Sequence, residues 1–567
     1  MDSACDRGKP APQIESLDRS RSQLSAKLTG TPGSGGVAGA LEVVLLKRSS
    51  ASSFLGALVV ALLVFFLHLP QTQDSILFDD AADYMRAAQA PVVATWLNTN
   101  SITPLELLHR RGSDPEFSQH PWFSLYIDGD NAALRHFHTP ITAYILHIVR
   151  GFFSTDRCAR VLWSVAGALL CGLLYFILAE FSVPLIVAAL IAIFAGVQAS
   201  LIEVSVDPTP HVWYLLFALG FLYLLARYFE SNRERDLYMA AVALALSVAT
   251  LEFSLELICA IPLAVAILWF IRRDLLPARS TALKHTLKAC GVFFVTTFAI
   301  WPGGWLRGGY LECYGVLGAS VLQRNHGPQH TQHFASRVFL KASGGHTAVW
   351  ILVGAALAAG LWLLYRKRLS IPSVVFASCA VFAFGLGVAD HFVLNTFFFE
   401  AAVILMAAAG LILGDLFAEL RGVHGAASRT PGWMRPACIA LVCVFLVVGS
   451  ALECQPQHRS EAWGTRAWLG GVFAGVRQLV PAGATVLAQN NREAFSLYLP
   501  EYHFVFAPDY HTPFEEMIRL SNSSAMWRPG EQRYGVCIPR EYIPAGAETL
   551  GVFPASAGDN EFLWRVR

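Results

Sequence analysis

The chain alternates long apolar runs with short polar connections. Apolar runs near the length of about 20 residues that a membrane-crossing helix needs recur along most of the sequence. They lie at 54–69, 161–179, 185–202, 211–229, 237–251, 257–271, 287–301, 346–365, 371–388, 392–413 and 437–451. This pattern predicts a polytopic α-helical membrane protein with about eleven transmembrane helices.

One further run, at 140–153, has the length expected of an interfacial or re-entrant helix. If it does not cross, the basic connections at 227–236, 271–285, 365–370 and 421–435 all fall on the side of the N-terminus. This arrangement obeys the positive-inside rule. We therefore predict a multi-pass protein of the bacterial inner (plasma) membrane, with a cytoplasmic N-terminus and an extracytoplasmic C-terminus.

The composition agrees with a membrane protein. Of the 567 residues, 54% are hydrophobic and 15% are charged, whereas soluble domains carry about 25% charged residues. The net charge is +1, and the basic residues form short scattered clusters. No extended basic face is present, so we expect membrane lipids as partners and no nucleic acid.

The pattern divides the chain into three parts. Residues 1–50 are rich in Ser, Gly, Pro and basic side chains and predict a disordered cytoplasmic tail. Residues 51–452 hold the crossings, with large outer loops at 70–157 and 302–345. Residues 453–567 predict a soluble extracytoplasmic α/β domain, because short alternating runs indicate strands and two amphipathic runs indicate helices. The strands are expected at 484–489, 503–507, 534–539, 549–554 and 562–567, and the helices at 492–499 and 513–520.

An acidic, aromatic segment, FDDAADYMRAAQ at 78–89, follows the first crossing and holds three carboxylates, Asp79, Asp80 and Asp83. Ionisable side chains beside a bilayer are costly and usually mark substrate sites or face water. The alternative is that Asp79 or Asp80 caps a short helix. We favour Asp80 as a functional acid, because an i, i+4 relation places it on one helical face with Tyr84.

Other polar groups also fall on the predicted outer side. They are Glu203, Asp207, Glu252, Glu256, Asp390 and His391 at the ends of crossings, and Arg307 and Arg324 in the second large loop. An enzyme at this face would need an activated substrate delivered through the membrane, for which a lipid-linked phosphate is the obvious form. Cations can hold a departing lipid phosphate while a carboxylate takes a proton from the incoming nucleophile. These ingredients suit glycosyl transfer.

The chain resembles the GT-C superfamily of polytopic glycosyltransferases. The resemblance is to the branch with dolichyl-phosphate-mannose protein mannosyltransferases, aminoarabinose transferases and bacterial lipopolysaccharide glycosyltransferases. Three places carry it: Asp80 with Tyr84 and the alanines that follow, the segment FHTPITAYILHIV at 137–149 with the lead DRCARVLWSVAG at 156–167, and Asp207-Pro208. The family's commoner Asp-Glu and Pro-Pro pairs read Asp79-Asp80 and Thr139-Pro140 in this chain.

The resemblance implies an inverting transferase that uses a polyprenyl-phosphate sugar donor and a lipid, glycan or protein acceptor. The residues implicated in catalysis are Asp80, Asp79 and Asp207, and it stays open which of the first two is the key acid. Those implicated in substrate binding are Tyr84, Arg86, Arg135, His138, Glu203, Arg307, Arg324 and His391.

No certain cofactor is expected. The histidines of RNHGPQHTQHF at 324–334 lack the spacing and the partner ligands of a zinc site. A divalent cation, Mg²⁺ or Mn²⁺, between Asp80 and Asp207 is an open alternative. The main rival function is a multi-span transporter or flippase of a lipid-linked or small polar substrate. Transport sites gather near the bilayer midplane, whereas these acids gather at predicted helix ends and in loops.

Overall fold

The computed structural model describes most of the chain beyond the N-terminal segment. The described residues are 50–73, 80–99, 139–152, 156–273, 278–311, 313–315, 347–389, 395–421, 431–454, 464–488, 492–506, 532–537, 543, 546–554 and 560–566. All of them belong to one compact unit, Ser50–Arg567. The predicted cytoplasmic tail lies outside the described residues, except for Ser50.

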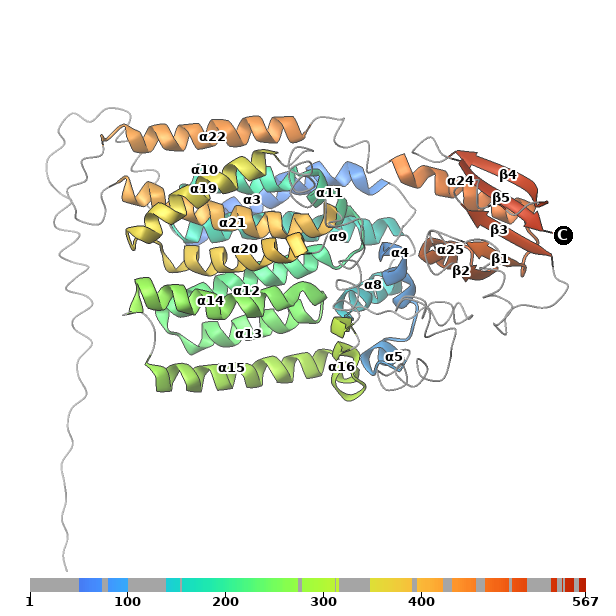
Figure 1. Cartoon of the computed structure of the whole chain (residues 1–567), viewed down its shortest axis with the longest axis horizontal. Helices are drawn as coiled ribbons and strands as arrows, with labels where there is room; N and C mark the ends of the chain where they lie inside the picture. Colours follow the sequence, from blue (N-terminus) through green and yellow to red (C-terminus); the bar gives the residue numbers. More distant parts are fainter. Residues whose placement is uncertain are drawn as a thin grey trace, which may run out of the picture. The chain divides into compact units, whose positions relative to one another are not determined.

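Each apolar run of the sequence is helical, and the long helices lie side by side as a bundle (Figure 1). The helices are α3 (Ser50–His68), α9 (Asp156–Glu180), α10 (Leu185–Gly196), α11 (Ala199–Val206), α12 (His211–Ser231), α13 (Glu234–Val248), α14 (Leu255–Ile271), α15 (Arg279–Ile300), α19 (Thr347–Tyr365), α20 (Ile371–Ala389), α21 (Asn395–Glu419) and α22 (Met434–Glu453).

The run at 185–202 forms two helices, because α10 and α11 are bent by 65° at their junction. The side-chain amide of Gln198 donates a hydrogen bond of 3.1 Å to the carbonyl of Phe194. It thus satisfies one of the carbonyl groups that the end of α10 leaves without an intrahelical partner.

The chain is a multi-pass integral membrane protein, but the expected count of about eleven crossings is not confirmed. Among the described residues, six helices are long and apolar enough to cross, and seven if the bent pair forms one span. The other four expected crossings are helices that fail that test. α13 and α14 have 15 and 17 residues, the apolar part of α20 is short, and α15 carries Lys284 and Lys288 in its first half.

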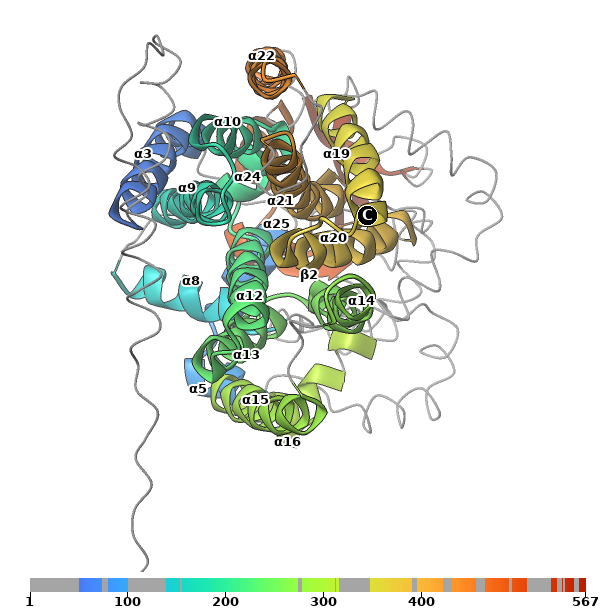
Figure 2. The same cartoon turned by 90° about the vertical axis from the view of Figure 1, so that its left-hand side faces the viewer.

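Close packing of small residues joins the first crossing to α9, its neighbour in Figure 2. A Cβ atom added to Gly172 would lie 2.9 Å from the carbonyl oxygen of Ala57, so glycine is needed for this approach. Small residues serve the same purpose at other membrane helix contacts. The opposite face of α3 is apolar and open, with Phe54 66% exposed, and suits contact with lipid.

Short elements collect at one end of the bundle, which we call the α4 end (Figure 1). They are η1 (Leu69–Gln73), α4 (Asp80–Ala87), α5 (Val92–Trp96), α8 (Ile141–Phe152), η4 (Glu252–Ser254) and α16 (Pro302–Leu306). The run that predicts an interfacial or re-entrant helix is α8, which has 12 residues.

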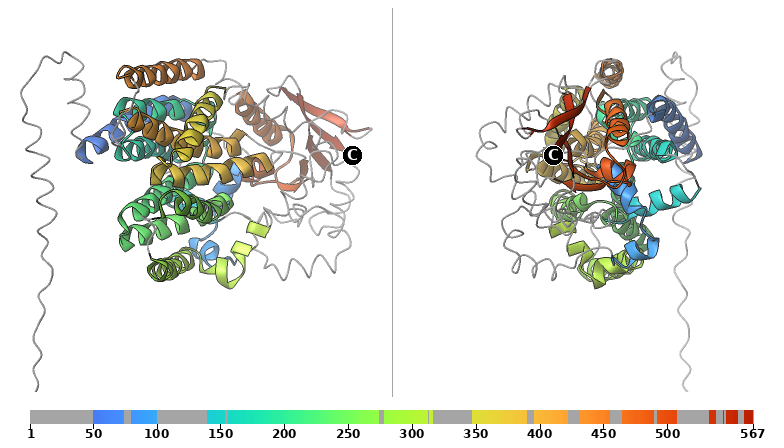
Figure 3. Two further views of the ribbon diagram at one scale, coloured as in Figure 1. Left: turned by 60° about the vertical axis from the view of Figure 1, so that its left-hand side comes forward. Right: turned by 90° about the vertical axis from the view of Figure 1, so that its right-hand side faces the viewer.

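The C-terminal region forms a five-stranded mixed sheet, seen from its own side in the right-hand view of Figure 3. The strand order is β2-β1-β3-β5-β4; β1 is parallel to β2 and β3, whereas β5 is antiparallel to β3 and β4. The elements are α24 (Gly464–Leu479), β1 (Thr485–Ala488), α25 (Arg492–Tyr498), β2 (His503–Phe506), β3 (Arg533–Cys537), β4 (Glu548–Pro554) and β5 (Asn560–Val566). All five strands and α25 lie where the sequence predicts them. The helix expected at 513–520 lies outside the described residues.

Candidate functional site

The helix that begins at Asp80 is anchored by its apolar face. Ala81, Ala82, Tyr84 and Met85 of α4 are buried and belong to a hydrophobic cluster with residues of α8 and α9. Alanine side chains let neighbouring helices approach closely, which accounts for the Ala-rich pattern after the acidic pair. The packing therefore places the start of α4 directly beyond the first crossing, at the α4 end.

The first turns of α9 connect α4 to residues 207–210 between α11 and α12, which we call the Asp207 turn. Ala159 and Trp163 pack in the same cluster as α4, and the indole N–H of Trp163 donates to the carbonyl of Thr209 at 2.6 Å. The guanidinium of Arg160 lies 3.1 Å from a carboxylate oxygen of Asp207, and neither side chain is more than 10% exposed. A buried guanidinium and a buried carboxylate compensate each other's charge, so Asp207 is held against α9.

Helix α8 ties together the ends of several helices. The ring nitrogen Nδ1 of His147 is 3.0 Å from the carbonyl of Ala88, just beyond α4. The backbone N–H of Ile141 donates to the carbonyl of Ala249 at the end of α13, and the hydroxyl of Tyr144 donates to the carbonyl of Ile300 at the end of α15. These bonds satisfy carbonyls at helix termini and keep α8 across the end of the bundle.

Two further carboxylates are buried at this end. Glu252, 5% exposed, accepts a hydrogen bond of 3.2 Å from the backbone N–H of Thr139. Glu256, 4% exposed, accepts one from the hydroxyl of Tyr214. Buried carboxylates are costly unless they are hydrogen-bonded or paired. Their presence next to α8 and α14 shows that the α4 end of this mostly apolar bundle contains buried, hydrogen-bonded carboxylates.

A second loop segment completes the site. The indole N–H of Trp301 donates to the carbonyl of Thr95 at 3.0 Å, and Nε of Arg307 donates to the carbonyl of Asn98 at 2.9 Å. Gly303 fits directly against the backbone of Leu97, since an added Cβ would lie 2.2 Å from its carbonyl carbon. These contacts fasten α16 to α5 and hold the half-buried Arg307 at the α4 end.

The phenols of this segment are neutral hydrogen-bonding groups. Burial raises the pKa of Tyr310 and of Tyr314 above the ordinary range of tyrosine. Tyr310 also packs edge-on against Trp301, with 4.8 Å between the ring centroids. The segment therefore adds aromatic surface beside one fixed cation.

The C-terminal region reaches the site through α25. Phe495 of α25 belongs to the same hydrophobic cluster as Tyr84, and α25 packs on α4. The hydroxyl of Tyr498 donates to Asp156, the first residue of α9, at 2.9 Å. The C-terminal region thus supports the helix that carries Asp80.

The structure places part of the predicted site residues at the α4 end. Asp80 is the first residue of α4, Tyr84 and Arg86 follow on it, Glu203 and Asp207 lie at the end of α11, and Arg307 follows α16. Tyr84 is buried to 1% exposure, so it packs in the cluster that anchors α4. The other predicted residues lie outside the described residues: Asp79, Arg135, His138, Arg324 and His391.

Sequence reasoning missed two pairings. Arg160, the partner of Asp207, lies in the segment DRCARVLWSVAG, which carries part of the family resemblance but offers no sign of that contact. Tyr214, the partner of Glu256, lies inside a crossing and reads as an ordinary aromatic residue. A polar side chain at the start of an apolar run, as Arg160, or within one, as Tyr214, is the signal that could have singled out both residues, although it does not identify their partners.

A metal ion in the described part of the chain would need several His, Cys, Asp or Glu ligands close together. No group of three His, Cys, Asp or Glu side chains in that part of the chain could hold one. The carboxylate of Asp207 already forms an ion pair with Arg160. A divalent cation between Asp80 and Asp207 therefore stays a prediction.

Comparison with known proteins identifies the fold. No family model matches the chain, and no curated protein matches it in sequence. Among solved structures, it is similar to ArnT from Cupriavidus metallidurans, an aminoarabinose transferase, in the apo state. The identity is 12%, the TM-score is 0.52, and the match covers 91% of this chain and 98% of ArnT.

Two further structures match. ArnT from Cupriavidus metallidurans bound to undecaprenyl phosphate is 13% identical, with a TM-score of 0.52 and coverage of 90% of this chain and 97% of that chain. The S. cerevisiae protein O-mannosyltransferase Pmt1-Pmt2 complex bound to the sugar donor is 15% identical, with a TM-score of 0.33 and coverage of 46% and 34%. The last score is too low to establish a common fold. The two ArnT matches show that this chain shares the fold of ArnT.

Proposed function

We propose that this protein is an inverting membrane glycosyltransferase that moves a sugar from a polyprenyl-phosphate donor to an acceptor at the α4 end. The observation that carries the proposal is the fold shared with ArnT over 91% of the chain. A structure of ArnT holds undecaprenyl phosphate. The anchoring of the Asp80 helix directly after the first crossing supports it independently.

In the proposed reaction, Asp80 acts as the general base. Its carboxylate takes the proton of an acceptor hydroxyl, and the acceptor oxygen forms a bond to the anomeric carbon of the sugar. The bond between that carbon and the phosphate oxygen breaks, and the lipid phosphate leaves with the electron pair. Attack from the face opposite the leaving group inverts the anomeric centre. Asp79 is the alternative base.

Cations at the same end would stabilise the phosphate leaving group, which carries its negative charge as the bond breaks. Arg86 on α4 and Arg307 after α16 are the described candidates, and Arg135 and Arg324 are further candidates from the sequence. Glu203 and the histidines His138 and His391 are proposed to contact the sugar or the acceptor. Tyr84 and the Arg160–Asp207 pair are proposed to position α4 and the Asp207 turn, because they are buried.

The proposed orientation places the α4 end outside the cytoplasm. The N-terminus then lies in the cytoplasm, the C-terminal region lies outside, and the membrane is the bacterial inner (plasma) membrane. The basic connections at the other end of the bundle support this orientation through the positive-inside rule. Labelling of single cysteines from outside intact cells tests it: a cysteine at Gln89, which is exposed beside α4, should react, and one at the exposed Glu230 should not.

A transporter or flippase is not favoured. The buried carboxylates Asp207, Glu252 and Glu256 lie at helix ends, at the end of α11, in η4 and in the first turn of α14. Binding sites of secondary transporters lie near the bilayer midplane, typically at broken helices. The broken pair α10 and α11 places its bend near the α4 end, where it positions Asp207.

A strain that lacks the protein and carries plasmid-borne variants tests the reaction. Asp80→Asn keeps the size of the side chain, and asparagine caps a helix as well as aspartate does, so a loss of function would not reflect a lost cap. We expect product glycan, measured by mass spectrometry, to form about 10²–10⁴-fold more slowly, the usual contribution of a general base.

Two matched variants accompany this one. Asp79→Asn decides which acid of the pair is the base, and Glu234→Gln, at the other end of the bundle, should retain full transfer. Unchanged transfer in both Asp80→Asn and Asp79→Asn would contradict the proposal. Protein levels in the membrane, compared by immunoblot, exclude loss through misfolding.

A further inference from the structure

An apolar groove separates α14 from the layer of α12, α13 and α15. Its volume is about 750 Å³. Small side chains on α13 and α15, among them Ala240, Ala282 and Ala289, face larger ones on α14, among them Val265 and Trp269. Figure 2 looks along the bundle and shows α14 next to α20, with α12, α13 and α15 as a neighbouring row of helices. The groove is lined by apolar side chains over most of its length.

The groove is open to lipid along α14. Its lining on this helix runs from Ile258 to Trp269, a distance of about 16 Å at the 1.5 Å rise of an α-helix. That length exceeds half of the ~30 Å hydrocarbon thickness of a bilayer, so one acyl chain fits along it. Ile258 and Trp269 are exposed, the latter by 54%. In a membrane-crossing bundle, such exposed apolar residues face lipid and not water.

The end of the groove away from the α4 end carries cations. Arg273 lines the groove, and its guanidinium carbon lies 5.4 Å from the ring centroid of Trp269. The amine of Lys367 lies 5.1 Å from the ring centroid of the next residue, Phe270. Within the described part of the chain, no carboxylate is paired with Arg273 or Lys367. This end therefore presents positive charge beside an apolar groove.

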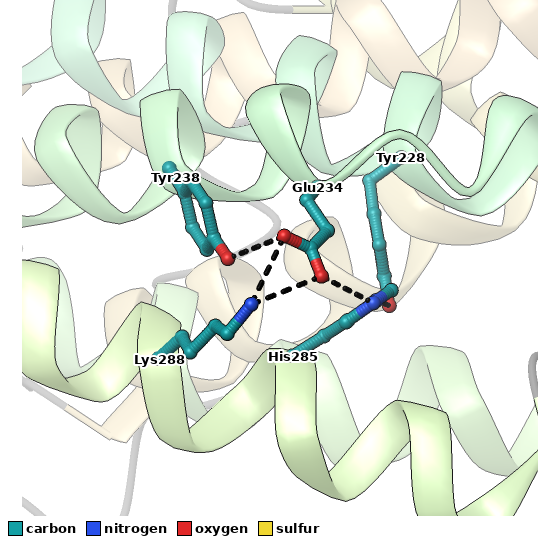
Figure 4. A network of polar contacts seen from close by, with 5 residues as sticks. All are labelled: Tyr228, Glu234, Tyr238, His285 and Lys288. Atoms are coloured by element: carbon teal, nitrogen blue, oxygen red, sulfur yellow. Dashed lines mark hydrogen bonds and ion pairs between the residues drawn. The ribbon is translucent and has the colours of Figure 1, made fainter.

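A polar network braces the other wall of the same end (Figure 4). The hydroxyl of Tyr228, which lines the groove, is 3.0 Å from Nδ1 of His285, and Nε2 of His285 is 2.9 Å from the carboxylate of Glu234. The carboxylate of Glu234 also accepts hydrogen bonds from Tyr238 and Lys288. The network joins the turn between α12 and α13 to α15, and Glu234 balances the charge of Lys288. Among the described residues that line the groove, Arg273 is therefore the cation without a carboxylate partner.

We propose that this groove is a binding site for an anionic phospholipid of the surrounding bilayer. One acyl chain lies between α14 and the α13–α15 wall, and the phosphate of the headgroup contacts Arg273, with Lys367 nearby. The headgroup site is distinct from the proposed reaction site, because Arg273 lies at the end of the bundle opposite α4. A polyprenyl phosphate has the same anionic group, but a donor bound there would hold its sugar away from Asp80.

Two native cysteines provide a test without any substitution. Cys290 lines the groove, whereas Cys259, on α14, does not line it, and both are exposed. The full chain, purified in detergent, is labelled with a maleimide, and peptide mass spectrometry follows each thiol. We expect phosphatidylglycerol to slow labelling of Cys290 and not of Cys259, with a weaker effect of phosphatidylcholine of the same chain length. Equal labelling of Cys290 with and without phosphatidylglycerol would overturn the proposal.

Native mass spectrometry of variants tests the role of the cation. Arg273→Gln should weaken retention of phosphatidylglycerol about tenfold, the loss expected for one hydrogen bond to a charged group, and leave phosphatidylcholine retention unchanged. Arg366→Gln is the matched control, because Arg366 also lies over an aromatic ring, that of Trp362, but pairs with Glu419 and does not line the groove. Phosphatidylglycerol retention that is equal in Arg273→Gln and wild type would contradict the assignment of the headgroup.

A third arm identifies the lipid. Undecaprenyl phosphate added in the same titration should not displace phosphatidylglycerol or protect Cys290 at equal concentration. If it displaces phosphatidylglycerol and depends equally on Arg273, the groove binds a polyprenyl phosphate and the phospholipid assignment is wrong. All arms measure binding, so their outcome does not depend on glycosyl transfer.

Discussion

The two ends of the helical bundle carry opposite kinds of polar chemistry. At the α4 end, the carboxylates of Asp207, Glu252 and Glu256 are buried, with exposed fractions of 7%, 5% and 4%. At the other end, cations are more exposed and lie over aromatic rings, as Arg273 does over Trp269. Burying a carboxylate costs free energy unless donors compensate it, whereas a cation at a membrane surface stays in contact with water and lipid headgroups.

This difference assigns a task to each end. The α4 end is built from hydrogen bonds between segments far apart in sequence, such as those that α8 makes to the ends of α13 and α15. It therefore has a defined geometry, as the proposed sugar transfer requires. The other end of the bundle has cations beside aromatic rings, the residue types that are enriched where membrane proteins meet the bilayer surface. The proposed lipid site lies at this end.

The largest stability effect should follow a break in the Arg160–Asp207 pair. Arg160→Met leaves the carboxylate of Asp207 buried without its cation, which should lower the free energy of unfolding by about 3–5 kcal/mol. Denaturation of purified protein in one detergent measures the change. The double variant Arg160→Met with Asp207→Leu removes both charges and should recover most of the loss. A double variant as unstable as the single one would show that the pair is not the cause.

A smaller effect is expected at the contact between α5 and α16. Gly303→Ala forces a methyl group against the backbone of Leu97, and such overpacking usually costs about 1–3 kcal/mol. The shift should also displace Arg307 and reduce the proposed sugar transfer. Gly291→Ala on α15 is the matched control, since its added Cβ meets nothing within 4 Å. Full transfer by Gly303→Ala would place α16 and Arg307 outside the reaction site.

The smallest effect is expected at the opposite end. Hydrogen bonds from Tyr238 and Lys288 lower the pKa of Glu234, which precedes the predicted crossing at 237–251. A carboxylate with a lowered pKa stabilises the fold above its ordinary pKa, and this contribution is lost as the pH falls through the lowered value. Because Glu234 is solvent-accessible, Glu234→Gln should scarcely change stability at pH 7. The variant should also lose less stability than wild type on acidification, as thermal unfolding at a series of pH values would reveal.

Local patterns predicted the elements well. The described residues of the apolar runs are helical, with one run divided into α10 and α11, and all five C-terminal strands lie in the expected segments, because hydrophobic periodicity is a property of neighbouring residues. The expected number of about eleven crossings, in contrast, is not confirmed. A run such as that of α15 is helical, but Lys284 and Lys288 make its first half polar, and hydropathy alone does not say where such a helix enters the bilayer.

The sequence by itself determined that the chain is a polytopic helical membrane protein. It singled out Asp80 in the segment after the first crossing, Asp207 at the end of a crossing and Arg307 in the second large loop. Only the tertiary structure decided that Asp207 meets Arg160, that Glu256 meets Tyr214, and that α25 supports α4. The physical reason is range. Helix formation depends on residues within one or two turns, whereas these pairings join segments tens to hundreds of residues apart, and no local pattern encodes which distant partner satisfies a buried charge.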